Sequence, residues 1–189
     1  MSSAGTAPDG PQHPGAPHGG IETIDHLVEH LAALADPSMI VVGIGNDLCG
    51  DDGAGPAVAR ALAGAVPWEV LDAQTVPESF LMRIVNRRPA TVVLVDAVDF
   101  HARPGAVDLL ESTQLSGQGP STHGPAPLAF LELLGMLHPC RSAVLAIQPK
   151  QSDPGQPLSA EVRRAVEFVT EAFKRLAAGT GGRASQGAP

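Results

Sequence analysis

The segment from Met39 to Arg60, MIVVGIGNDLCGDDGAGPAVAR, constrains the fold of this chain more than any other. It begins with a continuous apolar run rich in β-branched residues, which is typical of a strand buried in a parallel sheet. The run ends in residues that suit a tight turn: Gly43, Gly45 and Asn46. Two carboxylates, Asp51 and Asp52, then precede an alanine-rich helical segment. This order predicts an α/β sheet with a ligand site beyond the carboxyl end of the strand.

The same alternation of strands and helices continues along the chain. Apolar runs predict the strands, and apolar residues at helical spacing predict the helices. The predicted strands span residues 39–44, 68–73, 91–98, 106–110 and 141–148, and the predicted helices span 21–35, 54–62, 80–87, 128–137 and 158–178. This pattern predicts a three-layer α/β fold, a doubly wound, mostly parallel sheet with helices on both faces.

The domain organisation follows from shifts in composition. Residues 21–178 form one predicted domain, in which residues 21–36 are an additional N-terminal helix. Residues 1–20 are rich in Pro, Gly and Ser and predict a disordered tail, because they cannot bury enough apolar surface to offset the entropy of ordering. Residues 179–189 are polar and Gly-rich and predict a second disordered tail. A long polar loop over residues 112–127 is of the kind that is often functional.

Charge and hydropathy exclude several classes of protein. A net charge of −8 argues against a nucleic-acid partner, because phosphate binding needs clustered Lys and Arg. No apolar run approaches the length of a membrane span, and no signal peptide is evident. The two cysteines, Cys49 and Cys140, imply no disulfide framework. We therefore expect a cytoplasmic protein.

Three polar residues fall where the ends of strands and their loops should converge: Asp52, Asp96 and His123. Two carboxylates and one imidazole suit a divalent metal with an open coordination position. The wide spacing along the chain leaves open whether they meet, and Asp96 could equally be a satisfied cap on a neighbouring loop. For Asp51 the favoured interpretation is an N-cap, since Asp before a helix accepts a backbone N–H.

Other patterns carry weaker signals. The dinucleotide pattern GxGxxG fails at Leu48, and the Walker pattern lacks its Gly-Lys-Ser/Thr, which argues against a nucleotide site. We interpret Cys49 as a small apolar filler rather than an activated thiol. The pair His26 and His30 is four residues apart on a predicted helix, a spacing that could hold a metal, although a plain surface face is the favoured interpretation. The histidines at positions 13 and 18 are interpreted as solvated tail residues.

The motif GIGNDLCGDDGAGPAV, at residues 43–58, resembles the signature of the hydrogenase maturation proteases. The resemblance continues through VPES (76–79), VLVDAVDF (93–100), STHGPAPLAFL (121–131) and LAIQPK (145–150). It covers roughly residues 39 to 176 and is greatest for the branch that serves formate-hydrogenlyase-type hydrogenases. Hydrogenase maturation proteases are endopeptidases that trim the C-terminus of the nickel–iron hydrogenase large subunit. The resemblance implies a phosphorylase/hydrolase-like fold.

The resemblance implies roles for particular residues. The metal ligands and catalytic residues of the family fall on Asp52, Asp96 and His123 by motif, with a substrate loop shaped by Gly43, Gly45, Asn46 and Asp51. It further implies that nickel is carried by the substrate, a large-subunit precursor, and that another divalent metal can act as a surrogate. Whether the metal is catalytic or only recognised stays open.

Three other functions remain as alternatives. One is a self-contained metallopeptidase or amidohydrolase, the second is a non-catalytic hydrogenase maturation chaperone, and the third is a phosphorylase-like enzyme sharing the fold. Metal content, the mass of the partner after incubation, and turnover of nucleoside with phosphate would separate them.

Overall fold

The computed structural model describes residues 20–111 and 126–181. Within these ranges a five-stranded sheet has the order β2-β1-β3-β5-β4. The strands are β1 (Ile40–Ile44), β2 (Glu69–Gln74), β3 (Thr91–Ala97), β4 (Val107–Glu111) and β5 (Arg141–Ile147). Neighbouring strands pair in parallel except at one edge, where β4 is antiparallel to β5. The prediction of a mostly parallel sheet is confirmed.

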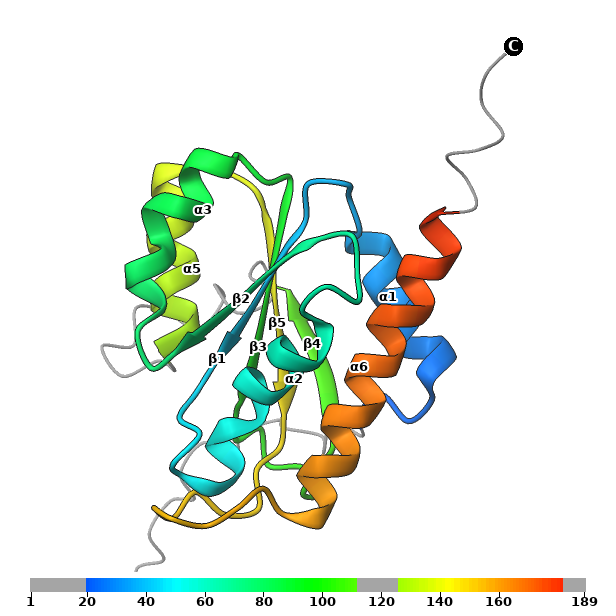
Figure 1. Ribbon diagram of the computed structural model, residues 1–189, viewed down its shortest axis with the longest axis vertical. Helices are drawn as coiled ribbons and strands as arrows, with labels where there is room; N and C mark the ends of the chain where they lie inside the picture. The colour runs from blue at the N-terminus through cyan, green and yellow to red at the C-terminus, as the bar shows by residue number, and fades with distance from the viewer. Residues whose placement is uncertain (1–19, 112–125, 182–189) are drawn as a thin grey trace, which may run out of the picture.

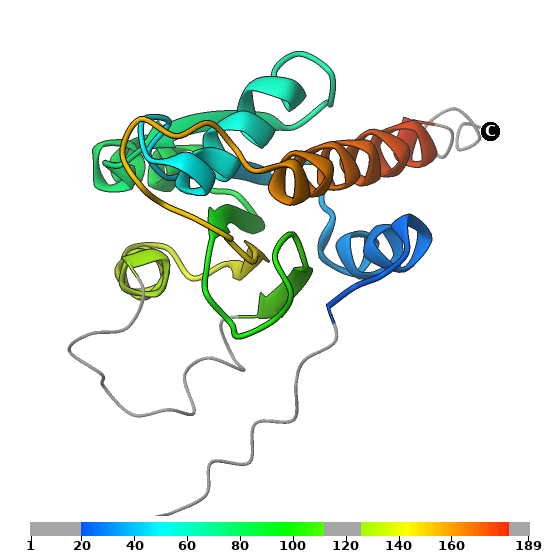
Figure 2. The same cartoon turned by 90° about the horizontal axis from the view of Figure 1, so that it is seen from below.

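Helices cover both faces of this sheet, as predicted. The described helices are α1 (Ile24–Leu34), α2 (Ala54–Leu62), α3 (Leu81–Arg87), α5 (Ala126–Leu137) and α6 (Ala160–Gly181), with short 3-10 turns η1 (Gly50–Gly53) and η2 (Pro77–Phe80). Helices α3 and α5 lie on one face, and α2 and α6 lie on the other with α1 beside α6 (Figure 1, Figure 2). The fold therefore has three layers. None of the described helices is both long and apolar enough to span a bilayer.

Alternation along the central strands produces two separate apolar clusters. Val41 and Val93 belong to the cluster formed with α1, α2 and α6. Val42 and Leu94 belong to the cluster formed with α3 and α5. Because successive side chains of a strand point to opposite faces, continuous apolar runs in β1 and β3 are what a sheet covered on both sides requires.

Two element boundaries differ from the predicted ones by three residues, and the others lie within two residues of the prediction. Helix α1 begins at Ile24 rather than residue 21, because the hydroxyl of Thr23 accepts the backbone N–H of His26 at 3.3 Å and caps the helix. Helix α6 continues to Gly181, three residues into the predicted C-terminal tail. The rest of that tail, and residues 1–19, lie outside the described residues.

Candidate functional site

The strand order creates a switch point between β1 and β3. Strand β1 is flanked by β2 on one side and β3 on the other, so the connection from β1 leads toward β2 while the chain after β3 leads toward β5 and β4. In open α/β sheets, ligands bind in the crevice outside the carboxyl ends of strands at such a point. Asp96 lies near the end of β3, and η1, which carries Asp52, follows β1.

Two glycines bring helix α2 unusually close to the sheet. A Cβ atom at Gly55 would lie 2.2 Å from the carbonyl oxygen of Ile44 and 2.3 Å from that of Val95. A Cβ atom at Gly43 would lie 2.2 Å from the carbonyl oxygen of Gly55. The start of α2 therefore rests directly on the backbones of β1 and β3, which holds η1 over the ends of both strands.

Gly45 fixes the turn between β1 and η1. Its φ of +138° favours glycine, and a Cβ atom there would lie 1.8 Å from the carbonyl oxygen of Asp52. The same carbonyl accepts the backbone N–H of Asn46 at 3.2 Å. The side-chain oxygen of Asn46 in turn accepts the N–H of Leu48 at 3.0 Å, which closes a local turn. Gly43, Gly45 and Asn46 thus shape the loop, and their contact with substrate remains a prediction.

Asp52 and Asp96 form an acidic pair at the switch point. Asp96 is 7% exposed. Burial is the main reason that its pKa is raised to about 7; the charge of Asp52 adds to the rise, and a hydrogen bond from the backbone of Ala97 opposes it. Burial also raises the pKa of Asp52, against a hydrogen bond from the backbone of Asn46. The structure therefore brings together two of the three predicted site residues, and their electrostatic coupling makes protonation of Asp96 sensitive to any added cation.

His123, the third predicted ligand, lies outside the described residues. Helix α5 begins three residues later, at Ala126, and leads into β5. Because β5 is parallel to β3, α5 must start at the edge of the sheet where these strands end, which is the edge of the acidic pair. Among residues 20–111 and 126–181, no group of three or more His, Cys, Asp or Glu side chains could hold a metal ion.

Asp51 has a role that the sequence did not reveal. Its side chain is fully buried, with 0% exposure, and its carboxylate accepts three backbone N–H groups. One oxygen accepts from Lys150 at 2.8 Å and Gln151 at 3.1 Å, and the other accepts from Ser159 at 2.6 Å. The N-cap interpretation is therefore wrong: the donors lie about a hundred residues away, and Cys49 is the residue at the N-cap of η1.

The bonds of Asp51 join two loops at the site edge. The backbone of residues 48–51 also pairs with the loop between β5 and α6: Gly155 donates to Leu48, Gly50 donates to Gln156, and Asp51 donates to Gln151, at 2.7 to 3.1 Å. The carboxylate of Asp51 faces inward and has no exposed surface. Asp51 therefore holds the segment 48–51 against the loop between β5 and α6 and positions the neighbouring Asp52, rather than facing a substrate.

A second charged network holds the outer side of the same loop. The guanidinium of Arg60 binds both carboxylate oxygens of Asp47, at 2.6 and 2.8 Å, and reaches Asp72 at 3.1 Å. The amide of Gln74 donates to Asp47 and Asp72. This network ties the loop after β1 to α2 and β2, and leaves Leu48 between the two sets of bonds with 74% of its surface exposed.

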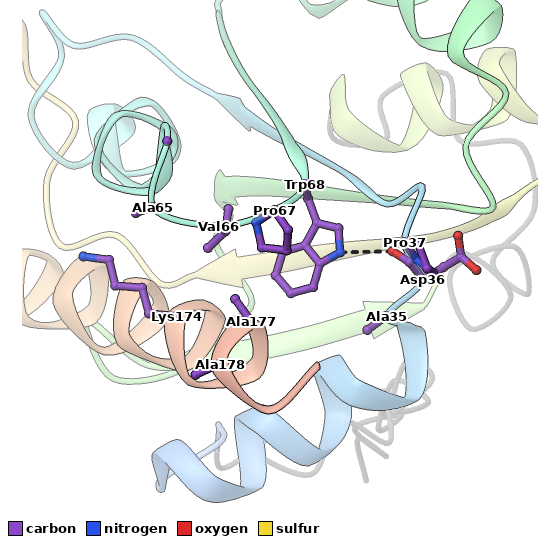
Figure 3. A pocket seen from close by; sticks show the side chains of 11 residues that line it. Ala35, Asp36, Pro37, Ala65, Val66, Pro67, Trp68, Lys174, Ala177 and Ala178 are labelled. Carbon is purple, nitrogen blue, oxygen red and sulfur yellow. Dashed lines mark hydrogen bonds between the residues drawn. The ribbon is translucent and has the colours of Figure 1, made fainter. Parts of the chain in front are cut away.

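A cavity of about 650 Å³ lies elsewhere in the molecule. Its walls come from the residues before β1, the residues before β2 and the end of α6 (Figure 3). Because these residues precede the strands, the cavity lies at the opposite end of the strands from the acidic pair. Trp68 crosses it, and its indole N–H donates to the carbonyl of Asp36 at 3.0 Å. The cavity has no cluster of titratable groups and is separate from the candidate site.

Comparisons with known proteins agree with the fold and with the predicted family. The family model HycI, hydrogenase maturation protease, matches residues 56–175. The hydrogenase 3 maturation protease of Escherichia coli K12 is 31% identical over 144 residues, which cover 72% of this chain and 87% of that protein. The chain belongs to the hydrogenase maturation protease family, a family of peptide hydrolases.

Solved structures show the same architecture. The crystal structure of a [NiFe] hydrogenase maturation protease HycI from Thermococcus kodakarensis superposes with a TM-score of 0.71, at 24% identity, over 79% of this chain and 99% of that one. The solution structure of the endopeptidase HycI from Escherichia coli gives a TM-score of 0.63 at 27% identity, over 73% of this chain and 90% of that one. The predicted α/β fold is confirmed.

Proposed function

We propose that this protein is an endopeptidase that removes the C-terminal extension of a nickel–iron hydrogenase large-subunit precursor. The observation that carries the proposal is the acidic pair Asp52 and Asp96, held at the switch point of a fold shared with HycI endopeptidases. Membership of the hydrogenase maturation protease family supplies the substrate class. We place the reaction in the cytoplasm, in keeping with two cysteines that are both free thiols.

We propose that Asp52, Asp96 and His123 approach nickel that the precursor already carries. Carboxylate oxygens and an imidazole are suitable donors for a divalent ion, although they hold it less tightly than thiolates would, and this suits a site that reads an ion bound by its partner. A divalent ion near the scissile bond supplies two effects: it polarises the carbonyl and lowers the pKa of an attacking water. Asp96, with a pKa of about 7, must release its proton to act as a ligand.

The same pair also supports a second mechanism, in which the carboxyls act directly. Two coupled carboxyls, one of them neutral near pH 7, can divide the roles of general acid and general base, as in an aspartic-type peptidase. In that case the ion would serve only for recognition. Cleavage of a precursor whose nickel has been replaced by another divalent metal distinguishes the two mechanisms, since direct acid–base catalysis should tolerate the exchange better.

The test uses purified, nickel-loaded precursor and mass spectrometry of its C-terminus. We expect cleavage by the wild-type chain and a loss of at least a hundredfold in rate for Asp52→Asn, Asp96→Asn and His123→Ala. Asp153→Asn is the matched control, because Asp153 is an exposed carboxylate on the neighbouring loop. Full activity of all three site variants would remove the assignment of the residues. An unchanged precursor mass with wild-type protein would refute the proposed endopeptidase function and favour a chaperone.

A metal analysis of the purified protein tests the remaining alternative. A self-contained metallopeptidase would retain about one equivalent of zinc through purification, because resident catalytic zinc is held by three protein ligands. We expect this protein to be isolated without that equivalent and to cleave only the loaded precursor. Equally fast cleavage of nickel-free precursor would contradict the sensing of nickel while leaving the peptidase activity intact.

A further inference from the structure

A pair of histidines on α1 forms a compact donor set far from the acidic pair. The Nε2 atoms of His26 and His30 lie 2.9 Å apart, and their ring centroids lie 4.5 Å apart. Both side chains are exposed, and α1 lies beside α6 on the outside of the molecule (Figure 1, Figure 2). The two Nε2 atoms therefore lie next to each other at the exposed surface of the helix.

We propose that His26 and His30 bind a late divalent transition ion, Ni²⁺ or Cu²⁺, at the surface of α1. Imidazole nitrogens bind such ions at about 2.0–2.1 Å. Two nitrogens 2.9 Å apart can both reach that distance from one ion, with an angle of about 90° between the two bonds. Without an ion, the pair shares one proton in an N–H···N hydrogen bond.

The separation of the two nitrogens fits some ions better than others. Square-planar and octahedral ions, such as Cu²⁺ and Ni²⁺, take neighbouring ligands at about 90°. Tetrahedral Zn²⁺ would need the two nitrogens about 3.4 Å apart. The remaining coordination positions would be filled by water, because the described residues offer no third His, Cys, Asp or Glu that completes the set.

The local charge favours a cation at this place. The segment from Glu22 to His30 contains three carboxylates and no Lys or Arg. Asp25 pairs with Arg175 at 3.3 Å and Glu22 with Arg103 at 3.6 Å, so two of the carboxylates are partly neutralised. The third carboxylate, Glu29, is exposed and lies next to His30 in the chain, so it adds negative potential near the pair.

The helix also supports the pair mechanically. Residues four apart on a helix lie one above the other, so the two rings face each other without rearrangement of the backbone. Thr23 caps the helix one turn before His26, and Leu27 and Leu31, between and beyond the histidines, are fully buried. The two histidines therefore lie on a helix that is capped at its start and packed against the core. The site does not depend on the proposed peptidase function, and it lies before the region matched by the family model.

The test is a titration of the full, untagged chain with NiCl₂, CuCl₂ and ZnCl₂ by calorimetry, after removal of metal with a chelator. Asp52→Asn/Asp96→Asn is the common background, so that the candidate peptidase site does not contribute. We expect His26→Ala and His30→Ala each to weaken binding of Ni²⁺ at least tenfold, and the double variant to lose one equivalent. His101→Ala, which removes an exposed histidine outside α1, should bind as the background does.

Two further measurements keep the proposal falsifiable. Saturating Ni²⁺ should raise the Tm of the background protein and leave that of the His26→Ala/His30→Ala form unchanged, since only a ligand of the folded state stabilises it. Both alanines favour helix, so circular dichroism should show α1 intact. Equal stoichiometry with and without the pair, or loss of binding on His13→Ala/His18→Ala alone, would overturn the site. Tighter binding of Zn²⁺ than of Ni²⁺ would overturn the assigned geometry.

Discussion

Replacement of Asp51 by Asn should markedly lower the free energy of unfolding of this protein. The carboxylate accepts three backbone N–H groups and is fully buried. Asparagine keeps one acceptor oxygen, which can serve Lys150 and Gln151. Its amide group then faces the N–H of Ser159, where the carboxylate oxygen lay at 2.6 Å, so that one hydrogen bond is lost and two donors oppose each other.

The magnitude follows from the bonds that change. A hydrogen bond to a charged group contributes about 1.5–3 kcal/mol, and the two bonds that survive become neutral ones of roughly half the strength. We therefore expect Asp51→Asn to lower the free energy of unfolding by about 3–6 kcal/mol. Asp51→Ala leaves three N–H groups without their acceptor and should cost on the order of 3–9 kcal/mol.

The assay is urea denaturation near neutral pH, combined with amide hydrogen exchange. In wild-type protein the amides of Lys150, Gln151 and Ser159 should be protected, and in Asp51→Asn the Ser159 amide should exchange fastest. Asp153→Asn, an exposed acid on the same loop, is the control and should change the free energy of unfolding by less than about 0.5 kcal/mol. If the free energy of unfolding of Asp51→Asn lies within that margin of wild type and exchange at Ser159 is unchanged, the inference that the Asp51 carboxylate holds the two loops together is refuted.

Other predictions concern the packing and protonation of the same region. The raised pKa of Asp96 means that the folded state holds this proton more tightly than the unfolded state, so stability falls as pH rises from about 4 to about 7. Asp96→Asn should gain about 2–3 kcal/mol relative to wild type between about pH 5 and about pH 8, measured by urea denaturation; a constant difference would contradict the shift. Gly55→Ala should cost about 3 kcal/mol or more, because its Cβ would collide with the backbones of β1 and β3. Gly135→Ala, in α5 with open space around the added Cβ, should instead gain about 0.5–1 kcal/mol in the same assay.

Much of the fold could be predicted because its determinants are local. The apolar runs of β1 and β3 are buried along their whole length, and such runs are rare outside parallel sheets. The start of α1 was missed although its signal was present, since Thr23 is a strong N-cap residue three positions before the residue that donates to it. Boundaries of this kind depend on single hydrogen bonds, which periodicity does not register.

The candidate site was only partly predictable, because its main contacts join distant parts of the chain. Asp96 ends an apolar run, and the sequence could not say whether a charge there is satisfied by a neighbouring loop; the structure places it beside Asp52 with little exposure. Asp51 looked like a helix cap because local preference favours that role. Its actual donors are on the loop between β5 and α6, and a separation of 99 to 108 residues leaves no local pattern.

The distance between the two acidic side chains is set by a residue that carries no charge. Gly55 lies in the first turn of α2, where glycine is a poor helix former and would be expected to weaken the helix. Its missing Cβ lets α2 touch the carbonyl oxygens of Ile44 and Val95 at the ends of β1 and β3. Any side chain there would lift η1 away from β3 and separate Asp52 from Asp96. The loss of helix propensity is therefore the condition for the close approach of the two carboxyls, whose coupling adds to the rise that burial causes in the pKa of Asp96. A helix with better local propensity would make a poorer site.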